Sequence, residues 1–367
     1  MGQIGIGILG GGYMGKAHSV AMTAVGAVFN TKLRPKLEMI CTARPETATQ
    51  YQQAYGFARS TTDWRILVND PKVEAIVIAT PQATHLDIAR AAFALGKPVF
   101  CEKPMGATLD EAREMTALAQ AAQVANMVGY NYIRTPASQY ARQLVADGVI
   151  GDITWFRGEH CEDFLADPAK PATWRTVDRA NGTMGDLAPH MINAALALIG
   201  PIKSLIAEIE TVHHQREGGE VDNDDHGQMM CRFENGAMGQ MYFSRISHGR
   251  KMGYTYEITG TKGAIRFDQE DQNALWLYKA QGPEAQRGFI KILTGPAHPD
   301  YLPFCLGPGH GTGYQDQIII EARDFLRAIE TSLPIWPRFS DGLAVQAVID
   351  AAFSSNQSKN WALVARK

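Results

Sequence analysis

The sequence predicts an α/β protein of two domains: an N-terminal doubly wound parallel sheet of the Rossmann type, over residues 1–135, and a C-terminal α+β domain with a largely antiparallel, open sheet, over 136–367. Three observations predict this. The 367 residues exceed what one hydrophobic core comfortably serves. Before residue 136, short apolar segments alternate with helical patterns, as in parallel sheets. After it, most segments have the character of strands joined by hairpin turns.

In the first domain, residues 4–9 form a buried strand in which isoleucine alternates with glycine, and a helix with apolar residues at three- and four-residue steps follows. Residues 73–80 are almost continuously apolar, which is typical of a strand covered on both faces. Thr108 and Glu111 form a capping signal for the last helix. The remaining elements expected here are strands over 37–41, 98–101 and 125–128, and helices over 46–55, 84–95 and 109–122.

In the second domain, the turns at 234–236 and 260–263 predict hairpin connections. Strands are expected over 153–159, 204–211, 228–233, 237–244, 254–259 and 264–267, and helices over 136–147, 187–199, 315–330 and 342–354. An open antiparallel sheet commonly leaves one face for a partner, so we expect a homo-oligomer; the family resemblance described below implies a tetramer or a dimer.

The composition excludes several classes of protein. The net charge is −3 and no cluster of basic residues is present, which argues against a nucleic-acid partner. No apolar run approaches the roughly 20 residues that a bilayer requires, and no secretory signal is evident. The five cysteines form no CxxC pair, so we expect reduced thiols and a cytoplasmic location.

A glycine-rich turn, Gly10-x-Gly12-Tyr13-Met14-Gly15, lies between the first strand and the first helix. In a βαβ unit this spacing indicates a dinucleotide site, because the glycines permit a tight turn and let the backbone approach a pyrophosphate. The phosphates would lie at the helix N-terminus, where N–H groups are available. The alternative is a purely structural turn, which is the less favoured interpretation in this context.

The choice between NAD and NADP depends on the end of the second strand. NAD-binding domains place an acidic residue there to bind the ribose. Here Thr42 and Arg44 occupy this end, and Glu38 lies at the other end of the strand. Arg44 is suited to a 2′-phosphate, so NADP is slightly favoured over NAD; the alternative for Arg44 is a solvated residue at a helix start.

Residues Glu102-Lys103-Pro104 follow a predicted strand at the carboxyl edge of the sheet, where ligands bind in such folds. Proline keeps Lys103 extended. A lysine beside a cationic nicotinamide would exchange protons at neutral pH. From the local sequence alone, a surface lysine in a loop is the simpler interpretation.

Taken together, the segment GILGGGYMGKAH at 7–18, Thr80-Pro81 with His85, and Glu102-Lys103-Pro104 resemble the glucose–fructose oxidoreductase/inositol dehydrogenase/rhizopine catabolism (Gfo/Idh/MocA) family. Gly185-Asp186-Leu187-Ala188-Pro189-His190 resembles the Asp-x-x-x-His segment of that family. The resemblance covers essentially the whole chain. It implies that Lys103, Asp186 and His190 surround the reacting carbon, and it places Thr80, Pro81, His85 and Glu102 at the cofactor.

Asp186 and His190 are four residues apart, so on a helix they share one face. Pro189 is tolerated only in the first turn, which puts Asp186 at or beside the N-cap. The alternatives are a capping role for Asp186 and a core position for His190. Asp186 and His190 indicate a catalytic role only when the glycine turn and Lys103 are considered together with them.

Further segments, at 129–132, 162–168, 174–175 and within 295–311, resemble segments of the dehydrogenases of inositols, L-glucose or levoglucosan. That resemblance implies contacts with the substrate for Tyr130, Asn131, Asp163 and His310, and contacts with the cofactor for Trp174 and Arg175. The alternatives are that the aromatic residues belong to the core, that Arg175 is a surface charge, and that His310 is part of a flexible loop.

We therefore expect an NAD(P)-dependent dehydrogenase acting on a secondary alcohol of a sugar or cyclic polyol. Two alternatives stay open, a sugar oxidoreductase that holds its cofactor tightly and a non-catalytic NAD(P) sensor. The run Asp222–His226 with His213 and His214 matches no familiar metal spacing. We interpret it as a solvated hairpin loop and assign no metal.

Overall fold

The computed structural model describes residues 2–365. They divide into two compact units. The first comprises residues up to 134 together with 313–343, and the second comprises 135–312 together with the residues from 344 onwards. The expected boundary at 135 lies at the first of these breaks, but residues 313–343 group with the first unit and not with the second domain, where the sequence placed them.

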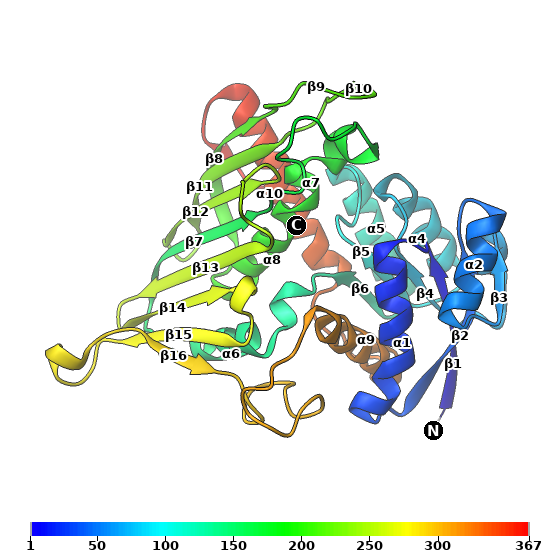
Figure 1. Ribbon diagram of the computed structural model, residues 1–367, viewed down its shortest axis with the longest axis horizontal. Coiled ribbons are helices and arrows are strands. Elements are labelled where there is room, and N and C mark those ends of the chain that lie inside the picture. The colour runs from blue at the N-terminus through cyan, green and yellow to red at the C-terminus, as the bar shows by residue number, and fades with distance from the viewer. Residues whose placement is uncertain (1, 366–367) are drawn as a thin grey trace. The chain divides into compact units, whose positions relative to one another are not determined.

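The first unit is built on a six-stranded sheet with the order β3-β2-β1-β4-β5-β6 (Figure 1). Every neighbouring pair is parallel. This order, with its reversal between β1 and β4, is that of the doubly wound dinucleotide-binding fold and confirms the predicted class. The strands are β1 (Gly2–Leu9), β2 (Leu33–Cys41), β3 (Arg59–Thr61), β4 (Ala75–Ile78), β5 (Val99–Glu102) and β6 (Asn126–Gly129).

The helices of the first unit pack in two groups, as two covered sheet faces require. One group holds α1 (Tyr13–Phe29), α2 (Pro45–Tyr55) and α9 (Tyr314–Thr331), and the other holds α3 (Trp64–Asn69), α4 (His85–Ala94) and α5 (Leu109–Ala122). The predicted limits of the last helix, 109–122, agree with α5. Strand β3 and helix α3 were not predicted, since each is short and carries polar residues.

Helix α9 belongs to the first unit because of what it buries. It packs along α1 (Figure 1). Gln315 donates to the Ala17 carbonyl at 2.9 Å, and the Phe325 ring lies 5.8 Å from that of Phe100 in an edge-to-face arrangement. Its helical pattern predicted the helix but carried no information on which core its apolar side enters.

The second unit is built on a nine-stranded sheet with the order β16-β15-β14-β13-β7-β12-β11-β8-β17. All pairs are antiparallel except β12 with β7, which confirms a largely antiparallel sheet. Its strands are β7 (Ile153–Cys161), β8 (Ile202–Glu210), β11 (His226–Phe233), β12 (Met238–Ser244), β13 (Gly253–Gly260), β14 (Gly263–Asp268), β15 (Ala274–Lys279), β16 (Ile290–Leu293) and β17 (Ala362–Leu363). A separate hairpin pairs β9 (Gln215–Arg216) with β10 (Gly219–Glu220).

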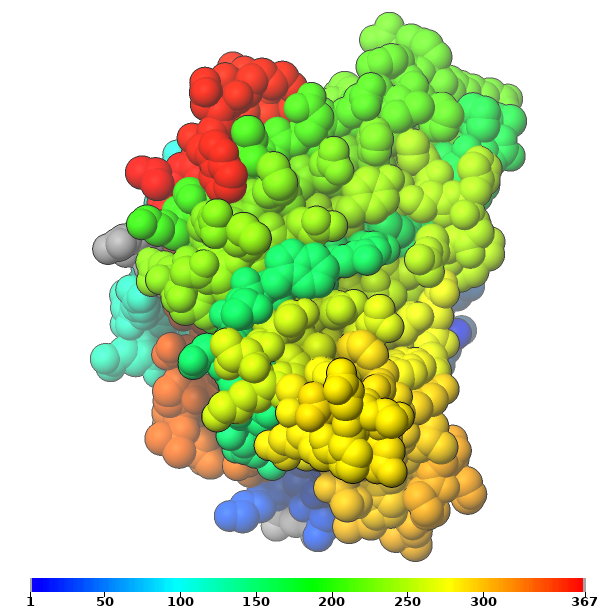
Figure 2. All heavy atoms as spheres, turned by 90° about the vertical axis from the view of Figure 1, so that its left-hand side faces the viewer, coloured from blue at the N-terminus to red at the C-terminus, as the bar shows by residue number. Residues whose placement is uncertain are grey.

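The helices of the second unit are α6 (Pro136–Ala146), α7 (Thr183–Asp186) and α8 (Ala188–Leu198), and α10 (Phe339–Ser358) begins in the first unit and ends in the second. Helices α6 and α8 pack on one face of the large sheet. Along β11 burial alternates strictly, with Met229, Cys231 and Phe233 inside. On the other face the strands lie at the molecular surface (Figure 2), where Met230 and Met238 are exposed. The sheet is therefore open on one side, as predicted.

Within residues 2–365 no helix combines the length and the apolar character that crossing a membrane requires.

Candidate active site

The glycine turn follows β1 and leads directly into α1. Gly10 has φ of +96°, and a Cβ at this position would lie 2.2 Å from the Ala79 carbonyl oxygen. A Cβ at Gly15 would lie 2.0 Å from the Gly10 carbonyl oxygen, so the helix packs directly against the turn. Both positions therefore require glycine for steric reasons.

Gly12 differs from its neighbours, because a Cβ there would meet no atom within 4 Å. Gly12 is the N-cap of α1, and no side chain caps that end. The first N–H groups of α1 thus face open space beside a backbone without side chains, which suits a pyrophosphate. Tyr13, next in the chain, is 73% exposed, and the Tyr314 hydroxyl lies 3.3 Å from the Met14 sulfur.

A third glycine, Gly11, carries a constraint that the fingerprint does not describe. A Cβ at Gly11 would lie 1.9 Å from the Tyr51 ring, and the Tyr55 hydroxyl donates to the Gly11 carbonyl at 3.2 Å. Tyr51 and Tyr55 stack with ring centroids 5.2 Å apart. These two residues of α2 support the turn from the side, and the sequence offered no signal for them.

Glu38 lies inside β2, because the strand begins at Leu33 and not at residue 37 as expected. Its carboxylate is buried and bonded to Lys36 and Arg59, which lower the pKa of the carboxyl. Glu38 is therefore committed to these two ion pairs. The Thr42 hydroxyl bonds to Arg44 O and to Thr47 Oγ1. Arg44 is the exposed N-cap residue of α2.

His85 is buried, with 1% of its surface exposed. Its Nε2 lies 2.9 Å from Thr80 O and its Nδ1 lies 3.2 Å from Met105 O. Burial lowers the pKa of the imidazole, which favours the neutral ring. His85 therefore joins the Thr80-Pro81 segment to the loop after Lys103, and its contact with the cofactor stays a prediction.

The Glu102-Lys103-Pro104 turn follows β5 at the carboxyl edge of the sheet. Glu102 is buried, with Oε1 2.6 Å from His18 Nε2 and Oε2 accepting from the Lys103 N–H at 3.3 Å. The Glu102 side chain thus anchors the turn, while the Lys103 side chain is half-buried. A Cβ at Gly129 would lie 2.9 Å from Glu102 Oε1, so that glycine makes room for the carboxylate.

Tyr130 and Asn131, expected to face the substrate, are 2% and 4% exposed. Asn131 Nδ2 donates to Gln317 Oε1 on α9 at 2.9 Å. Burial raises the pKa of the Tyr130 hydroxyl, which keeps it protonated. These side chains lie in the interior of the first unit, and their contact with the substrate stays a prediction.

In the second unit, Asp186 is the last residue of α7 and precedes Leu187, the N-cap of α8, so it lies beside the cap as predicted. Asp186 Oδ2 accepts from Arg175 Nη1 at 2.6 Å. The Arg175 guanidinium also lies 4.4 Å from the centre of the Trp174 ring, and Trp174 is exposed. Trp174, Arg175 and Asp186 therefore form one cluster within the second unit.

His190 lies in the first turn of α8, directly after Pro189. Its ring centroid is 5.6 Å from that of His160 on β7. His160 is fully buried, with Nδ1 2.8 Å from Leu187 O and Nε2 3.3 Å from Glu162 Oε1. His160 thus ties β7 to the N-cap of the helix that carries His190. The sequence analysis missed it, because a lone histidine in a strand carries no motif.

Asp163 accepts from Lys251 Nζ at 2.6 Å and from the Gly249 N–H at 3.2 Å, and Lys251 lowers the pKa of its carboxyl. Its carboxylate therefore has two partners already. His310 is exposed, with Nδ1 3.4 Å from Cys305 Sγ. The contacts of Asp163 and of His310 are thus with other residues than Asp186.

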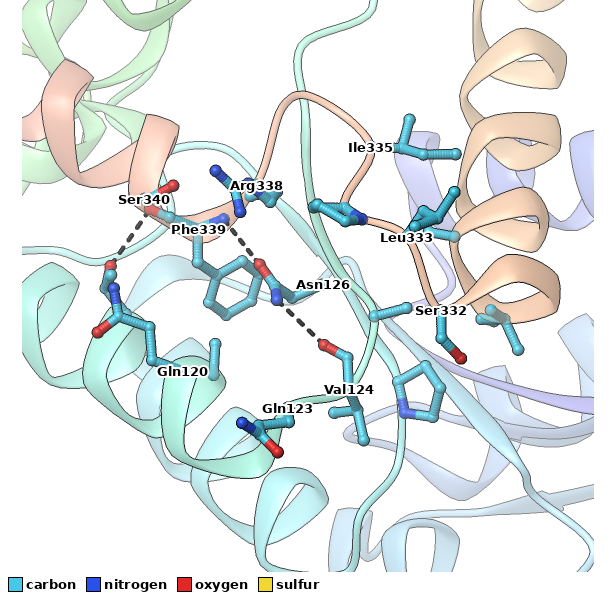
Figure 3. Close-up of a pocket in the computed structure, with 17 residues that line it drawn as sticks. Gln120, Gln123, Val124, Asn126, Ser332, Leu333, Ile335, Arg338, Phe339 and Ser340 are labelled. Atoms are coloured by element: carbon cyan, nitrogen blue, oxygen red, sulfur yellow. Dashed lines mark hydrogen bonds between the residues drawn. The ribbon is translucent and has the colours of Figure 1, made fainter.

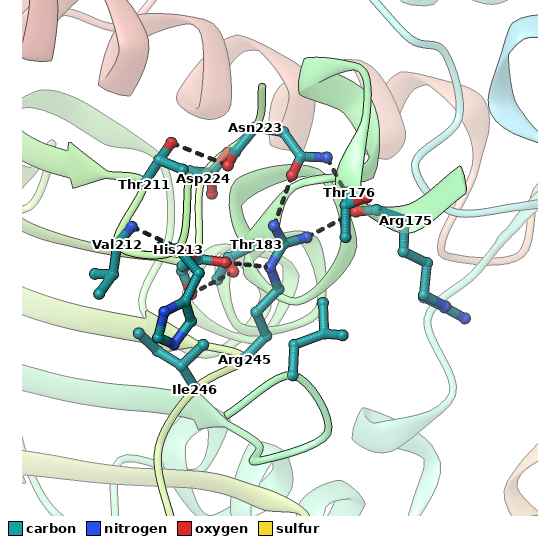
Figure 4. A network of polar contacts seen from close by, with 12 residues as sticks. Arg175, Thr176, Thr183, Thr211, Val212, His213, Asn223, Asp224, Arg245 and Ile246 are labelled. Atoms are coloured by element: carbon teal, nitrogen blue, oxygen red, sulfur yellow. Dashed lines mark hydrogen bonds and ion pairs between the residues drawn. The ribbon is translucent and has the colours of Figure 1, made fainter. Parts of the chain in front are cut away.

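The run Asp222–His226 corrects one expectation. Asp222 is exposed, but Asn223, Asp224 and Asp225 are buried, so the interpretation as a solvated loop is wrong. They bind Arg245 and backbone groups of neighbouring segments (Figure 4). Among residues 2–365 no three histidine, cysteine, aspartate or glutamate side chains gather closely enough to hold a metal ion.

A pocket of about 430 Å³ lies in the first unit away from the glycine turn (Figure 3). Its lining includes Pro98 and residues 124–126, at the amino ends of β5 and β6, together with Phe339 and Ser340. The turns with cofactor motifs follow the carboxyl ends of β1 and β5, so this pocket is not the dinucleotide site.

Comparison with known proteins agrees with these features. Residues 4–130 match the oxidoreductase family with an NAD-binding Rossmann fold, and residues 138–266 match the GFO/IDH/MocA C-terminal domain. A levoglucosan dehydrogenase of Pseudarthrobacter phenanthrenivorans is 37% identical, with 98% of each chain aligned. An inositol 2-dehydrogenase of Rhizobium meliloti is 27% identical, also over 98% of each chain.

A solved structure of levoglucosan dehydrogenase in complex with NADH and levoglucosan has a TM-score of 0.97 and 37% identity, covering 99% of this chain and 100% of that one. The resemblance inferred from the motifs is thereby confirmed over the whole length. The chain belongs to the Gfo/Idh/MocA family and is a nicotinamide-dependent oxidoreductase.

Proposed function

We propose that this chain oxidises a secondary alcohol of a sugar or cyclic polyol, with an anhydrosugar of the levoglucosan type as the first candidate. The observation that carries the proposal is the partly exposed Asp186 carboxylate, which pairs with Arg175 and lies four residues before His190. The similarity to levoglucosan dehydrogenase over nearly the whole chain supports the choice of substrate class.

The bound nicotinamide supplies the hydride acceptor. In our proposal His190 takes the proton of the substrate hydroxyl, and Lys103 hydrogen-bonds the same oxygen and returns a proton in the reverse direction. Asp186 orients the neighbouring hydroxyls or polarises His190. The alternative exchanges the roles of Lys103 and His190.

For the cofactor, we propose that the 2′-phosphate of NADP is accepted beside Arg44. The exposed Arg44 side chain at the start of α2 and the commitment of Glu38 to Lys36 and Arg59 support this choice. We also propose that copies of the chain assemble through the open face of the large sheet, because exposed methionines lie there. Its five cysteines are all free thiols, four of them buried, which supports a cytoplasmic location.

The test of the reaction is Lys103→Ala, measured as kcat with levoglucosan and with a panel of inositols and of D- and L-glucose, each with NAD and NADP. A general acid–base group contributes about 10²–10⁴-fold, so we expect kcat to fall by at least about 100-fold. Lys72→Ala is the matched control, since Lys72 is an exposed lysine of the same unit, before β4. A loss in Lys103→Ala smaller than about tenfold would show that the assigned role is wrong.

A further inference from the structure

Arg245, directly after β12, is 1% exposed, and its guanidinium holds together segments that are distant in the chain (Figure 4). Nε donates to Asp225 Oδ1 at 3.1 Å, and Nη2 donates to Asn223 Oδ1 at 2.6 Å. Nη1 donates to the carbonyl oxygen of Arg175 at 2.8 Å. The buried charge is thus paired and hydrogen-bonded on several sides, as burial of an arginine requires.

Asn223 reinforces the same contact. Its Nδ2 donates to Arg175 O at 3.0 Å, and also to Val177 O and Asp178 O. The carbonyl of Arg175 therefore accepts from two buried side chains at once. The backbone that carries the Arg175 side chain is fixed from within the unit, although that side chain itself is partly exposed.

The same run fixes the start of α7. The Thr183 N–H donates to Asp224 O at 3.0 Å, and its hydroxyl donates to Asp225 O at 2.8 Å. The Met184 N–H donates to Asp224 Oδ2 at 2.7 Å. Helix α7 is four residues long and ends at Asp186. Residues 223–225 thus fix the backbone at Arg175 and at the start of α7, and these two segments carry the two partners of the Arg175–Asp186 ion pair.

We propose that Arg245, with Asn223, is a positioning residue for the oxidation: it sets the geometry of Arg175 and, through the ion pair, that of the Asp186 carboxylate. This inference rests on the proposed function, in which Asp186 acts at the substrate. A partly exposed ion pair contributes little on its own and has several accessible geometries. Two backbone anchors restrict it to one geometry, and a misplacement of about 1 Å at a reacting group costs about 100-fold in rate.

The test is the variant Arg245→Lys. Its kcat with levoglucosan is measured and divided by the number of nucleotide-binding sites, which is counted by nucleotide titration. Lysine retains the charge beside Asp225 but offers a single ammonium in place of the planar fork that reaches Arg175 O and Asn223 together. We expect a fall of about 10–100-fold. A merely structural role lowers the number of active sites and leaves kcat per site unchanged. Asn223→Ser repeats the test if Arg245→Lys does not fold.

The control is Thr211→Val, because the Thr211 hydroxyl donates to Asn223 O at 3.0 Å and bonds neither to Arg175 nor to α7. We expect this variant to keep kcat per site. The second measurement is a double-mutant cycle: in an Arg175→Ala background, Arg245→Lys is expected to add less than about twofold to the loss, since its path to Asp186 is already removed.

Asp186→Asn, measured in parallel, separates this inference from the proposed function. If Asp186→Asn keeps kcat, the assignment of Asp186 is wrong and the positioning role falls with it. If Asp186→Asn loses kcat but Arg245→Lys and Asn223→Ser keep it per site, only the positioning role is overturned. Additive losses in the cycle, or an equal loss in Thr211→Val, also overturn it.

Discussion

Asp224 is a buried carboxyl whose protonation is coupled to the stability of the second unit. Burial raises its pKa from 3.8 to about 6, against the opposing influence of the Met184 N–H and Arg245. Oδ2 accepts from Met184, and Oδ1 lies against Gly182. We predict that Asp224→Asn, which keeps an oxygen for Met184 but cannot ionise, gains stability relative to the wild type as the pH rises.

The sign follows from proton binding. Between pH 4 and pH 6 the folded chain binds more protons at Asp224 than the unfolded chain does, so the free energy of unfolding falls as the pH rises. The contribution of Asp224 to the free energy of unfolding is fully present below the pKa that Asp224 has in the unfolded chain, and it is lost above about pH 6. From pH 5 to pH 8 the loss amounts to about 1.4 kcal/mol. For a unit of roughly 200 residues this corresponds to about 3–6 °C in Tm.

The assay is scanning calorimetry of wild type and variant at pH 5, 6, 7 and 8, with the difference in Tm plotted against pH. Taking the difference removes every group that titrates equally in both proteins. Asp222→Asn is the control, because Asp222 belongs to the same run but is exposed. The difference for Asp224→Asn is expected to rise by the amount given above, and that for Asp222→Asn to stay level. A level curve for Asp224→Asn, or equal slopes for both variants, would refute the reasoning.

Three further predictions concern the cofactor turn, nucleotide preference and assembly. Gly10→Ala is expected to lower Tm strongly, because its Cβ would clash with Ala79 O. Gly12→Ala is expected to lower Tm less, through the poorer N-cap alone, but to weaken binding of the nucleotide by tenfold or more, or about 1.4 kcal/mol. Calorimetry and nucleotide titration on both variants distinguish the two effects, and equal losses of Tm would contradict them. Arg44→Ala is expected to lower kcat/KM for NADP by about tenfold more than for NAD, since one charge-assisted contact is removed. Steady-state assays with both nucleotides measure this, with the exposed Arg65→Ala as the control. An unchanged ratio of kcat/KM for NADP to that for NAD would count against a phosphate contact. The double variant Met230→Lys with Met238→Lys is expected to reduce the molar mass measured by light scattering to that of a single chain. The control Leu95→Lys, at an exposed position of the first unit, is expected to leave the molar mass unchanged. A molar mass of a single chain for the unmodified protein would refute the assembly.

Much of the first unit was predictable, because its signals are local. The continuous apolar run at 73–80 contains β4, and glycine spacing identified the turn before α1. Lys103 was selected as a candidate through its place after a predicted strand and through its neighbours, and its role stays a prediction. Strands β15 and β16 were missed, since residues 274–278 form a continuous apolar run without alternation, and β16 has four residues of which three are exposed.

The buried acidic run shows why part of the site escaped prediction. Asn223, Asp224 and Asp225 follow a glycine-containing loop, and consecutive acidic residues in such a place are usually solvated. What buries them is Arg245, twenty residues beyond Asp225 and on the other side of a hairpin. No local pattern connects the two. The partners of Glu102 and His190 were missed for the same reason, because His18 and His160 come from other elements.

The division of the chain has a consequence for its synthesis. Helix α9 packs against α1 and Phe100, yet about 180 residues of the other unit separate it from residue 134. While the ribosome extends the chain, the first unit must wait with part of its core uncovered until residues 313–343 have emerged, although N-terminal domains ordinarily fold first. A fragment that ends at residue 135 would expose the same apolar surface permanently. The gene therefore cannot be cut into two independently folding halves at the point where the sequence suggests a boundary.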